Sequence, residues 1–160
     1  MITIRNAEPG DVPQILHFVK ELADYEREAD KVVATEDLLH QAMFAGDRPA
    51  AEALIAEIDG TAAGMALFFH NFSTWTGWRG LYLEDLYVTP EARGSGVGKA
   101  LLQHLAGLAV ERGCTRFEWS VLDWNEKAIA FYRSVGALPM EEWTVYRVTG
   151  DALAKLADKN

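Results

Sequence analysis

The spacing of apolar residues predicts two helices in the first third of the chain. The first helix begins at Asp11-Val-Pro, where an acid caps the helix and a proline follows. Its apolar residues fall on one helical face: Ile15, Leu16, Val19 and Leu22. A second cap, Thr35-Glu-Asp-Leu, opens a short helix that ends near Gly46.

Short apolar runs bounded by turn residues predict strands. We expect six of them, over residues 2–5, 53–58, 62–70, 82–88, 115–121 and 143–148. Asp59-Gly60 joins the second and third strands and is a strong hairpin signal. Residues 71–80 form a tryptophan-containing loop, and Thr89-Pro90 closes the central strand, 82–88.

Helices alternate with strands in the second half of the chain. A long helix runs from Lys99 to Arg112 and stops at Gly113, and a second runs from Asn125 to Val135 and stops at Gly136. Thr149-Gly-Asp-Ala-Leu starts a terminal helix. A meander followed by alternating helices and strands indicates a mixed α/β sheet with helices on its faces, in a single domain over residues 1–160.

Composition narrows the class of protein. Hydrophobic residues make up 49% of the 160, which argues against disorder, and no apolar run approaches the roughly 20 residues that span a bilayer. The single cysteine, Cys114, excludes an internal disulfide and a cysteine-based metal cluster. Met1-Ile-Thr-Ile-Arg5 reads as a strand and not as a signal peptide, so we expect a cytoplasmic protein without a membrane partner.

Charge and histidine spacing exclude two kinds of ligand. The net charge of −9 argues against nonspecific nucleic-acid binding and is compatible with attracting small cations. The four histidines are scattered without ligand spacing, so we expect no metal: His17, His40, His70 and His104.

The most informative motif is a glycine-rich turn, Arg93-Gly-Ser-Gly-Val-Gly-Lys99, between the central strand and the long helix. Unpaired N–H groups and the helix dipole make such a turn a site for phosphate. It is not a Walker A loop, because Arg93 and Ala100 stand where that loop needs glycine and serine or threonine. Its glycine spacing is also one residue short of a Rossmann fingerprint.

The turn matches the R-x-x-G-x-G/A signature of the GNAT-type N-acetyltransferases. Further motifs resemble the spermidine/spermine acetyltransferase branch and its thialysine-acetylating relatives: Lys20-Glu-Leu-Ala-Asp-Tyr-Glu26, Tyr82-Leu-Glu-Asp85, Trp124-Asn-Glu126 and Phe131-Tyr132. The matching stretches run from Arg5 to about Val148. The chain thus resembles this branch over most of its length.

The resemblance implies a GNAT fold, with a central, mostly antiparallel sheet of six to seven strands that splays at the acetyl-coenzyme A site. It implies that the pantetheine arm pairs with Leu86, Tyr87 and Val88. The pyrophosphate would lie on the turn: Arg93, Gly94, Ser95, Gly96, Val97, Gly98 and Lys99. The other side of the coenzyme would be bordered by Asn125, Glu126, Lys127 and Ala128. A homodimer is also implied.

Acetyl transfer to an amine requires a base, because an alkylammonium of pKa ~10 has no lone pair at neutral pH. Glu84 and Asp85 are adjacent on a strand, so we expect their side chains on opposite faces, with one facing the acetyl group. The resemblance assigns amine binding and proton removal to Glu84, directly or through water, and makes Asp85 a second amine-binding candidate. It makes Tyr132 the general acid that protonates the departing thiolate.

The amine would be held by spaced acids and aromatic rings. By position the candidates are Tyr25, Glu26 and Glu142. The acids at positions 28 and 141 are either part of the amine site or ordinary solvated acids on loops, and the sequence favours neither reading. Glu141-Glu142-Trp143 lacks one residue expected between acid and tryptophan, which leaves polyamine, thialysine and other small amines open.

Two rival functions remain open on the sequence. One is a protein or peptide acetyltransferase on the same scaffold, and the other is a coenzyme-binding module without turnover. Glu84 and Tyr132 together argue against the second, since a binder needs neither.

Overall fold

The computed structural model describes residues 1–158 of the chain. The chain divides into two compact units, Met1–Ser120 and Val121–Asn160, which are described separately below.

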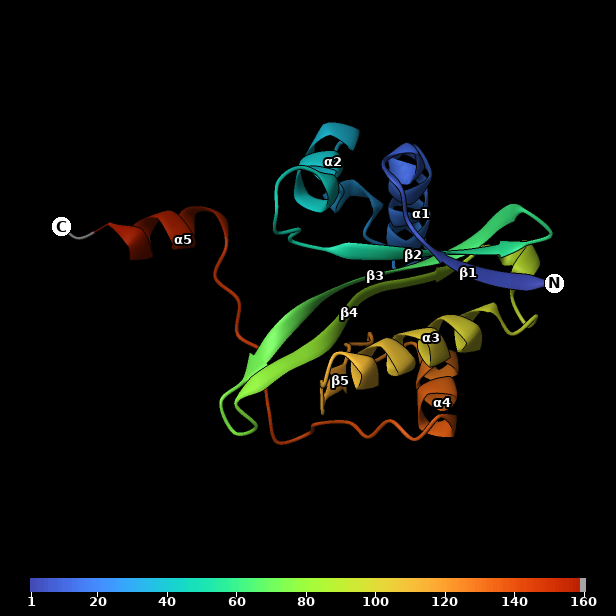
Figure 1. Cartoon of the computed structure of the whole chain (residues 1–160). Helices are drawn as coiled ribbons and strands as arrows, with labels where there is room; N and C mark the ends of the chain where they lie inside the picture. Colours follow the sequence, from blue (N-terminus) through green and yellow to red (C-terminus); the bar gives the residue numbers. More distant parts are fainter. Residues whose placement is uncertain (159–160) are drawn as a thin grey trace. The chain divides into compact units, whose positions relative to one another are not determined.

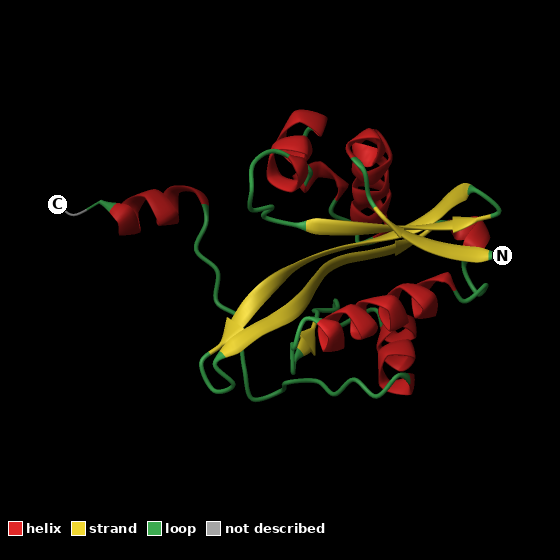
Figure 2. Ribbon diagram, in the orientation of Figure 1, coloured by secondary structure: helices red, strands yellow, loops and turns green. Residues whose placement is uncertain are grey.

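The first unit is a five-stranded sheet with helices on both faces (Figures 1 and 2). Its main elements are β1 (Ile2–Asn6), α1 (Val12–Tyr25), α2 (Glu36–Phe44), β2 (Glu52–Ile58), β3 (Thr61–Ser73), β4 (Trp78–Val88), α3 (Val97–Glu111) and β5 (Phe117–Glu118). Three single-turn 3₁₀ helices accompany them: η1 (Pro9–Asp11), η2 (Ala29–Lys31) and η3 (Pro90–Ala92). The strand order is β1-β2-β3-β4-β5, antiparallel except for the parallel pair β4 and β5. The mixed α/β prediction is confirmed, with fewer strands than the six to seven expected.

Two apolar layers hold helices against the sheet. On one face, Ile15 and Phe18 of α1 pack with Met65 of β3 and Tyr87 of β4. On the other face, α3 buries one side of its helix, including Leu101 and Leu105. Burial of side chains of this size contributes about 1.5–3 kcal/mol each. The end of β4 is therefore fixed between helices on both faces.

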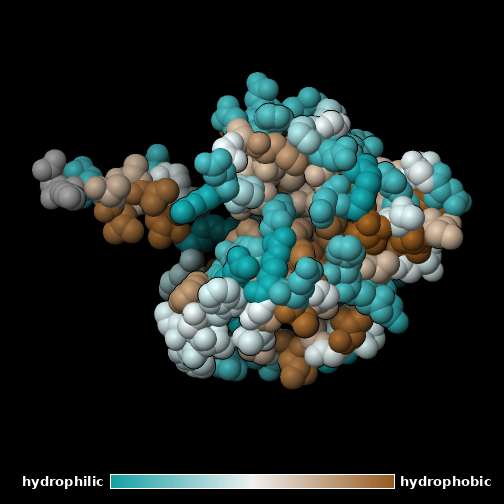
Figure 3. Space-filling model, viewed as in Figure 1, coloured by the Kyte–Doolittle hydropathy of each residue, from teal (hydrophilic) through white to brown (hydrophobic). Residues whose placement is uncertain are grey.

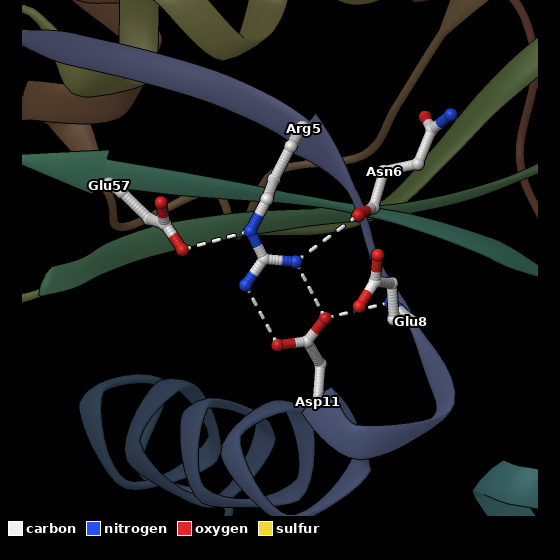
Figure 4. Close-up of polar contacts among 5 residues, drawn as sticks. All are labelled: Arg5, Asn6, Glu8, Asp11 and Glu57. Atoms are coloured by element: carbon white, nitrogen blue, oxygen red, sulfur yellow. Dashed lines mark hydrogen bonds and ion pairs between the residues drawn. The ribbon is translucent and has the colours of Figure 1, made fainter. Parts of the chain in front are cut away.

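Arg5 ties the first strand to its neighbours, as Figure 4 shows. Its guanidinium makes a bidentate contact with Asp11 at 2.7 and 2.9 Å, and its Nε donates to Glu57 at 2.8 Å. Asp11 stands at the N-cap of α1, but its side chain makes no cap bond there, because it accepts from Arg5 and from the Glu8 backbone N–H. The sequence identified the residue but not its partner.

The two turns that join β2 to β3 and β3 to β4 are short. Asp59-Gly60 forms the predicted hairpin turn, with φ of 50° and 83°. The loop expected over 71–80 is wrong: β3 continues to Ser73 and β4 begins at Trp78. The ladder continues because Gly80 has no Cβ, which would stand 2.4 Å from the side-chain oxygen of Asn71.

Two predicted strands are shorter than expected or missing. The run at 115–121 contributes only Phe117–Glu118, and residues 143–148 form no strand. A strand requires a partner for its backbone groups. Within the described part of the second unit no strand lies beside residues 143–148, and Trp143, Val145 and Tyr146 are exposed.

The second unit contributes α4 (Glu126–Ser134) and α5 (Gly150–Ala157), in agreement with the predicted helices. Exposed apolar side chains on α5 include Leu153 and Leu156. Figure 3 shows hydrophobic residues, in brown, along this helix. None of the helices in residues 1–158 has the length and apolar character needed to cross a bilayer.

Candidate active site

A β-bulge interrupts β4 at the two adjacent acids. Leu67 of β3 pairs with Asp85, and the next β3 residue, Phe68, pairs with Leu83. Glu84 is therefore an extra residue in β4, opposite no residue of its own. Bulges bend a strand locally and redirect the side chains beside them.

The bulge changes which way the acids point. Asp85 is opposite Leu67 and Tyr82 is opposite Phe69, so both follow the face of β3 that carries Leu67 and Phe69. Tyr82 and Asp85 are three residues apart and would lie on opposite faces of a regular strand. Regular alternation is therefore broken at the bulge, and because Glu84 has no partner in β3, the expectation that Glu84 and Asp85 lie on opposite faces stays a prediction.

The acids form a cluster with the end of α1. Glu26 follows the last residue of α1, and Glu84 and Asp85 are at the bulge. Burial raises the pKa of Asp85 to about 6, helped by the negative charges of Glu84 and Glu26. Burial also raises the pKa of Glu26, with contributions from Glu28 and Glu84.

Asp85 and Glu26 are half-buried, while Glu84 is exposed. The sequence predicted a desolvated carboxylate here and favoured Glu84. The structure assigns the desolvation to its neighbour. Over residues 1–158, no group of three or more His, Cys, Asp or Glu side chains is arranged to hold a metal ion.

Beyond the acids, β4 keeps one edge open. Pairing with β5 ends at Tyr82 opposite Glu118, and residues 83–88 pair only with β3 among the strands described. The predicted coenzyme-binding residues of this strand lie in that stretch: Leu86, Tyr87 and Val88. An open edge offers backbone N–H and C=O groups to an extended, amide-containing ligand.

The glycine turn follows that edge directly. Gly94 and Gly96 have φ of 82° and 95°, a backbone region that favours glycine, and a Cβ at either would point into open space. The Ser95 side chain donates to the Ala92 carbonyl, and α3 begins at Val97, two residues before the predicted start at Lys99. No N-cap side chain bonds to the first N–H groups of α3.

Arg93 connects the turn to the strand edge. Its Nε donates to the carbonyl of Val88 at 3.2 Å, and its guanidinium lies over the ring of Tyr25, 5.2 Å from the ring centre. Together with Lys99 it brings positive charge to a chain of net charge −9. An open strand edge, a helix N-terminus and two cations fit a ligand with a peptide-like arm and a pyrophosphate, as coenzyme A has.

The remaining predicted site residues belong to the second unit. Asn125 caps α4, its side chain accepting from the Ala128 N–H at 3.3 Å, with Glu126 and Lys127 in the first turn. Tyr132 is half-buried in the same helix. Glu142 lies exposed in the extended stretch after α4. Their roles beside the residues of the first unit remain predictions.

Comparison with protein families decides the class of enzyme. Residues 16–137 match the model of the acetyltransferase (GNAT) family, which is well over half of the chain. The chain belongs to the GNAT family. The match covers the acid cluster, the open strand edge and the glycine turn.

Individual relatives extend the resemblance of this acetyltransferase over nearly its whole length. It is 39% identical to the thialysine N-epsilon-acetyltransferase of Sus scrofa, covering 99% of this chain and 98% of that protein. It is 38% identical to the enzyme of the same name from Caenorhabditis elegans, covering 94% of each. It is 36% identical to the human spermidine/spermine N(1)-acetyltransferase-like protein 1, covering 96% of this chain and 23% of that protein.

A solved structure agrees with the fold. The integron cassette protein VCH_CASS6 from V. cholerae superposes with a TM-score of 0.81 at 28% identity, covering 99% of this chain and 98% of that one. The predicted GNAT fold is therefore confirmed.

The sequence does contain a signal for the bulge, a change in the spacing of apolar residues along β4. The apolar residues facing α3 fall at Leu81 and Leu83, then at Leu86 and Val88, so the alternation slips by one residue at the two acids. The contact between Tyr25 and Arg93 has no comparable sequence signal, because the two residues are distant in the chain.

Proposed function

We propose that this acetyltransferase transfers the acetyl group of acetyl-coenzyme A to a primary amine of a small cationic molecule, a polyamine, a diamine or a thialysine-like amine. The observation that carries the proposal is the cluster of Glu26, Glu84 and Asp85 beside the open edge of β4. Three neighbouring carboxyl groups suit a ligand that carries positive charge. The relatives named above for thialysine and spermidine/spermine support the same chemical class.

When bound, acetyl-coenzyme A supplies a thioester that an amine nitrogen can attack in a ternary complex. The backbone of Leu86, Tyr87 and Val88 would hold the arm of the coenzyme. Residues 93–99 would hold its pyrophosphate, with Asn125, Glu126, Lys127 and Ala128 on its other side. These are the residues that position the reacting carbonyl.

Glu84 and Asp85, the two acids at the bulge, would bind the amine and remove its proton. We assign proton removal to Glu84, directly or through water, and ammonium binding to Glu84 and Asp85. A carboxyl with a pKa of about 6, as at Asp85, is mostly ionised at neutral pH and still basic enough to share a proton. Because Glu84 and Asp85 interact, their titration belongs to the pair.

The far end of a longer amine would meet further acids and aromatic rings. We assign this role to Tyr25, Glu26 and Glu142. We also propose a cytoplasmic location and a homodimer, whose interface the exposed apolar side chains of the second unit would supply.

The rival proposal of a protein or peptide acetyltransferase predicts turnover on a peptide and none on free amines. A coenzyme-binding module predicts binding without turnover. The acid cluster favours the small cationic substrate over both, since neither rival needs three carboxyl groups around one strand bulge.

Tyr132→Phe tests the enzymatic proposal. A general acid typically contributes 10²–10⁴-fold, so we expect kcat to fall by at least about 100-fold while the Kd for coenzyme A stays unchanged. Steady-state kinetics and calorimetric titration measure the two quantities. Tyr146→Phe is the matched control, because it removes a hydroxyl from a tyrosine that is 91% exposed. Equal kcat values for the two variants would remove Tyr132 from the mechanism.

A further inference from the structure

We infer that Tyr25 is a positioning residue for the coenzyme, acting through Arg93, so that the last turn of α1 links the coenzyme site to the amine site. This inference rests on the proposed function. It gives Tyr25 a role on the coenzyme side in addition to the amine-binding role predicted from its place in the sequence.

The first step is the contact itself. The Arg93 guanidinium carbon lies 5.2 Å from the centre of the Tyr25 ring, within the range of a cation–π interaction. Its Nε is held at the same time by the Val88 carbonyl, 3.2 Å away. An arginine side chain has many rotamers, and two fixed contacts from different elements restrict it to few.

The second step is the place of Arg93 in the turn. It directly precedes Gly94, and its own backbone ends the 3₁₀ helix η3. A guanidinium carries five N–H donors in a planar fork that suits phosphate oxygens, and the contact with Val88 uses one of them. Orienting the fork in advance lowers the entropy lost when a pyrophosphate binds.

The charge of Arg93 also acts on Tyr87, a core residue of β4. Tyr87 is 4% exposed and stacks with Phe18 of α1, with ring centres 5.1 Å apart. Burial and the charges of Glu21 and Glu91 raise the pKa of Tyr87, while the positive charge of Arg93 lowers it. Arg93 is therefore near enough to Tyr87 for its charge to act there, and its guanidinium contacts the ring of Tyr25.

The third step is the neighbour of Tyr25. Glu26 belongs to the acid cluster, since the charge of Glu84 contributes to its raised pKa and its own charge contributes to that of Asp85. Adjacent residues at the end of one helix thus face two different parts of the site. Arg27 follows with φ of 63°, which ends the helix and fixes this turn. A coenzyme bound at the glycine turn would therefore restrain Glu26, which borders the amine.

The test measures the Kd of coenzyme A by calorimetry, in the absence of amine, for the full chain and its variants. Loss of an exposed cation–π contact corresponds to about a two- to fivefold weaker Kd, and we expect this for Tyr25→Leu. Tyr25→Phe keeps the ring and should bind like the native chain. In an Arg93→Gln background, Tyr25→Leu should have no further effect.

The outcomes separate the two proposals. If the native chain fails to bind coenzyme A, the proposed function itself fails. If the native chain binds and Tyr25→Leu binds equally well, with only the KM for the amine raised, this inference alone is overturned. It is also overturned if Tyr25→Phe is as weak as Tyr25→Leu, or if the effects in the Arg93→Gln background add. Should the leucine variant not fold by circular dichroism, Tyr25→Met replaces it with the same expected result.

Discussion

Asp85 combines two properties that oppose each other, a half-buried position that desolvates it and a carboxyl group. The bulge at Glu84 turns Asp85 toward the α1 side of the sheet, among groups that desolvate it, with two further acids nearby. Such a group costs stability in its charged form, and proteins accept that cost at sites where chemistry needs it. Asp85 should therefore affect stability and activity in opposite directions.

Asp85→Asn should raise the free energy of unfolding at pH 7.5 by about 1–3 kcal/mol and lower kcat/KM for the amine. The folded-state pKa of about 6 lies above the ordinary 3.8, so the native state binds more protons in that window. The free energy of unfolding of the native chain consequently falls as pH rises from about 4 to 6, and the cost persists at higher pH. Urea unfolding of both chains at pH 4 and pH 7.5 measures these free energies.

At pH 4 the stability difference between Asp85→Asn and the native chain should nearly vanish. If Asp85→Asn is instead less stable than the native chain at pH 7.5, the surroundings stabilise the Asp85 carboxylate, contrary to the desolvation described here.

Among the elements, the junction of β3, β4 and α3 determines how well the open edge is placed. A Cβ at Gly64 of β3 would stand 2.5 Å from the carbonyl oxygen of Tyr87 and 3.1 Å from the Cγ1 of Val97. The first contact is with backbone at the coenzyme edge, and the second is with the first residue of α3. The glycine thus permits strand and helix to approach at the point where the coenzyme arm and the pyrophosphate site meet.

Gly64→Ala should lower the free energy of unfolding by about 1–3 kcal/mol and weaken coenzyme binding, because the end of β4 has to move. Gly107→Ala is the control: this exposed glycine inside α3 has no neighbour within 4 Å of an added Cβ. It should stabilise the chain by about 0.5–1 kcal/mol without changing coenzyme affinity. Chemical denaturation and calorimetry check both, and native-like values for Gly64→Ala would contradict the close approach.

The sequence predicted well those elements that are fixed by residues adjacent or nearly adjacent in the chain. Thr35 caps α2 by accepting from the Leu38 N–H, Asp59-Gly60 makes the hairpin, and Gly94 and Gly96 make the turn. Each depends on φ preferences or caps within a few residues.

The elements that were missed depend on partners distant in the chain. The β3–β4 ladder extends this far because Gly80 has no Cβ to clash with the Asn71 side chain. Residues 143–148 have strand-like composition, but the part of their unit that the structure describes offers no strand partner. The same holds for the site: the turn was predictable from its motif, whereas the partial burial of Asp85 depends on the register of two strands. Local sequence identifies the residues of this site, and the pairing between strands decides which of the two acids is the less exposed.

For the whole chain, exposed apolar residues in the second unit predict self-association. Trp143, Val145 and Tyr146 are 68%, 82% and 91% exposed, and Leu156 of α5 is 74% exposed. We expect sedimentation equilibrium to give about twice the 17.8 kDa of one chain. A Trp143→Ser/Tyr146→Ser double variant should shift the equilibrium toward the monomer, whereas Val110→Thr, at an exposed position in α3, should not. A monomer at all concentrations would contradict the proposed homodimer.

The central claim is acetyl transfer to a small cationic amine, and the direct test is steady-state release of free coenzyme A from acetyl-coenzyme A. The panel holds spermidine, spermine, putrescine, thialysine, lysine, an aminoglycoside and a histone-tail peptide. We predict turnover on a polyamine or thialysine with kcat/KM of about 10⁴ M⁻¹s⁻¹ or more, in the ordinary range of enzymes. Turnover on the peptide alone, with none on any free amine, would contradict the account and assign the acid cluster of Glu26, Glu84 and Asp85 to a different purpose.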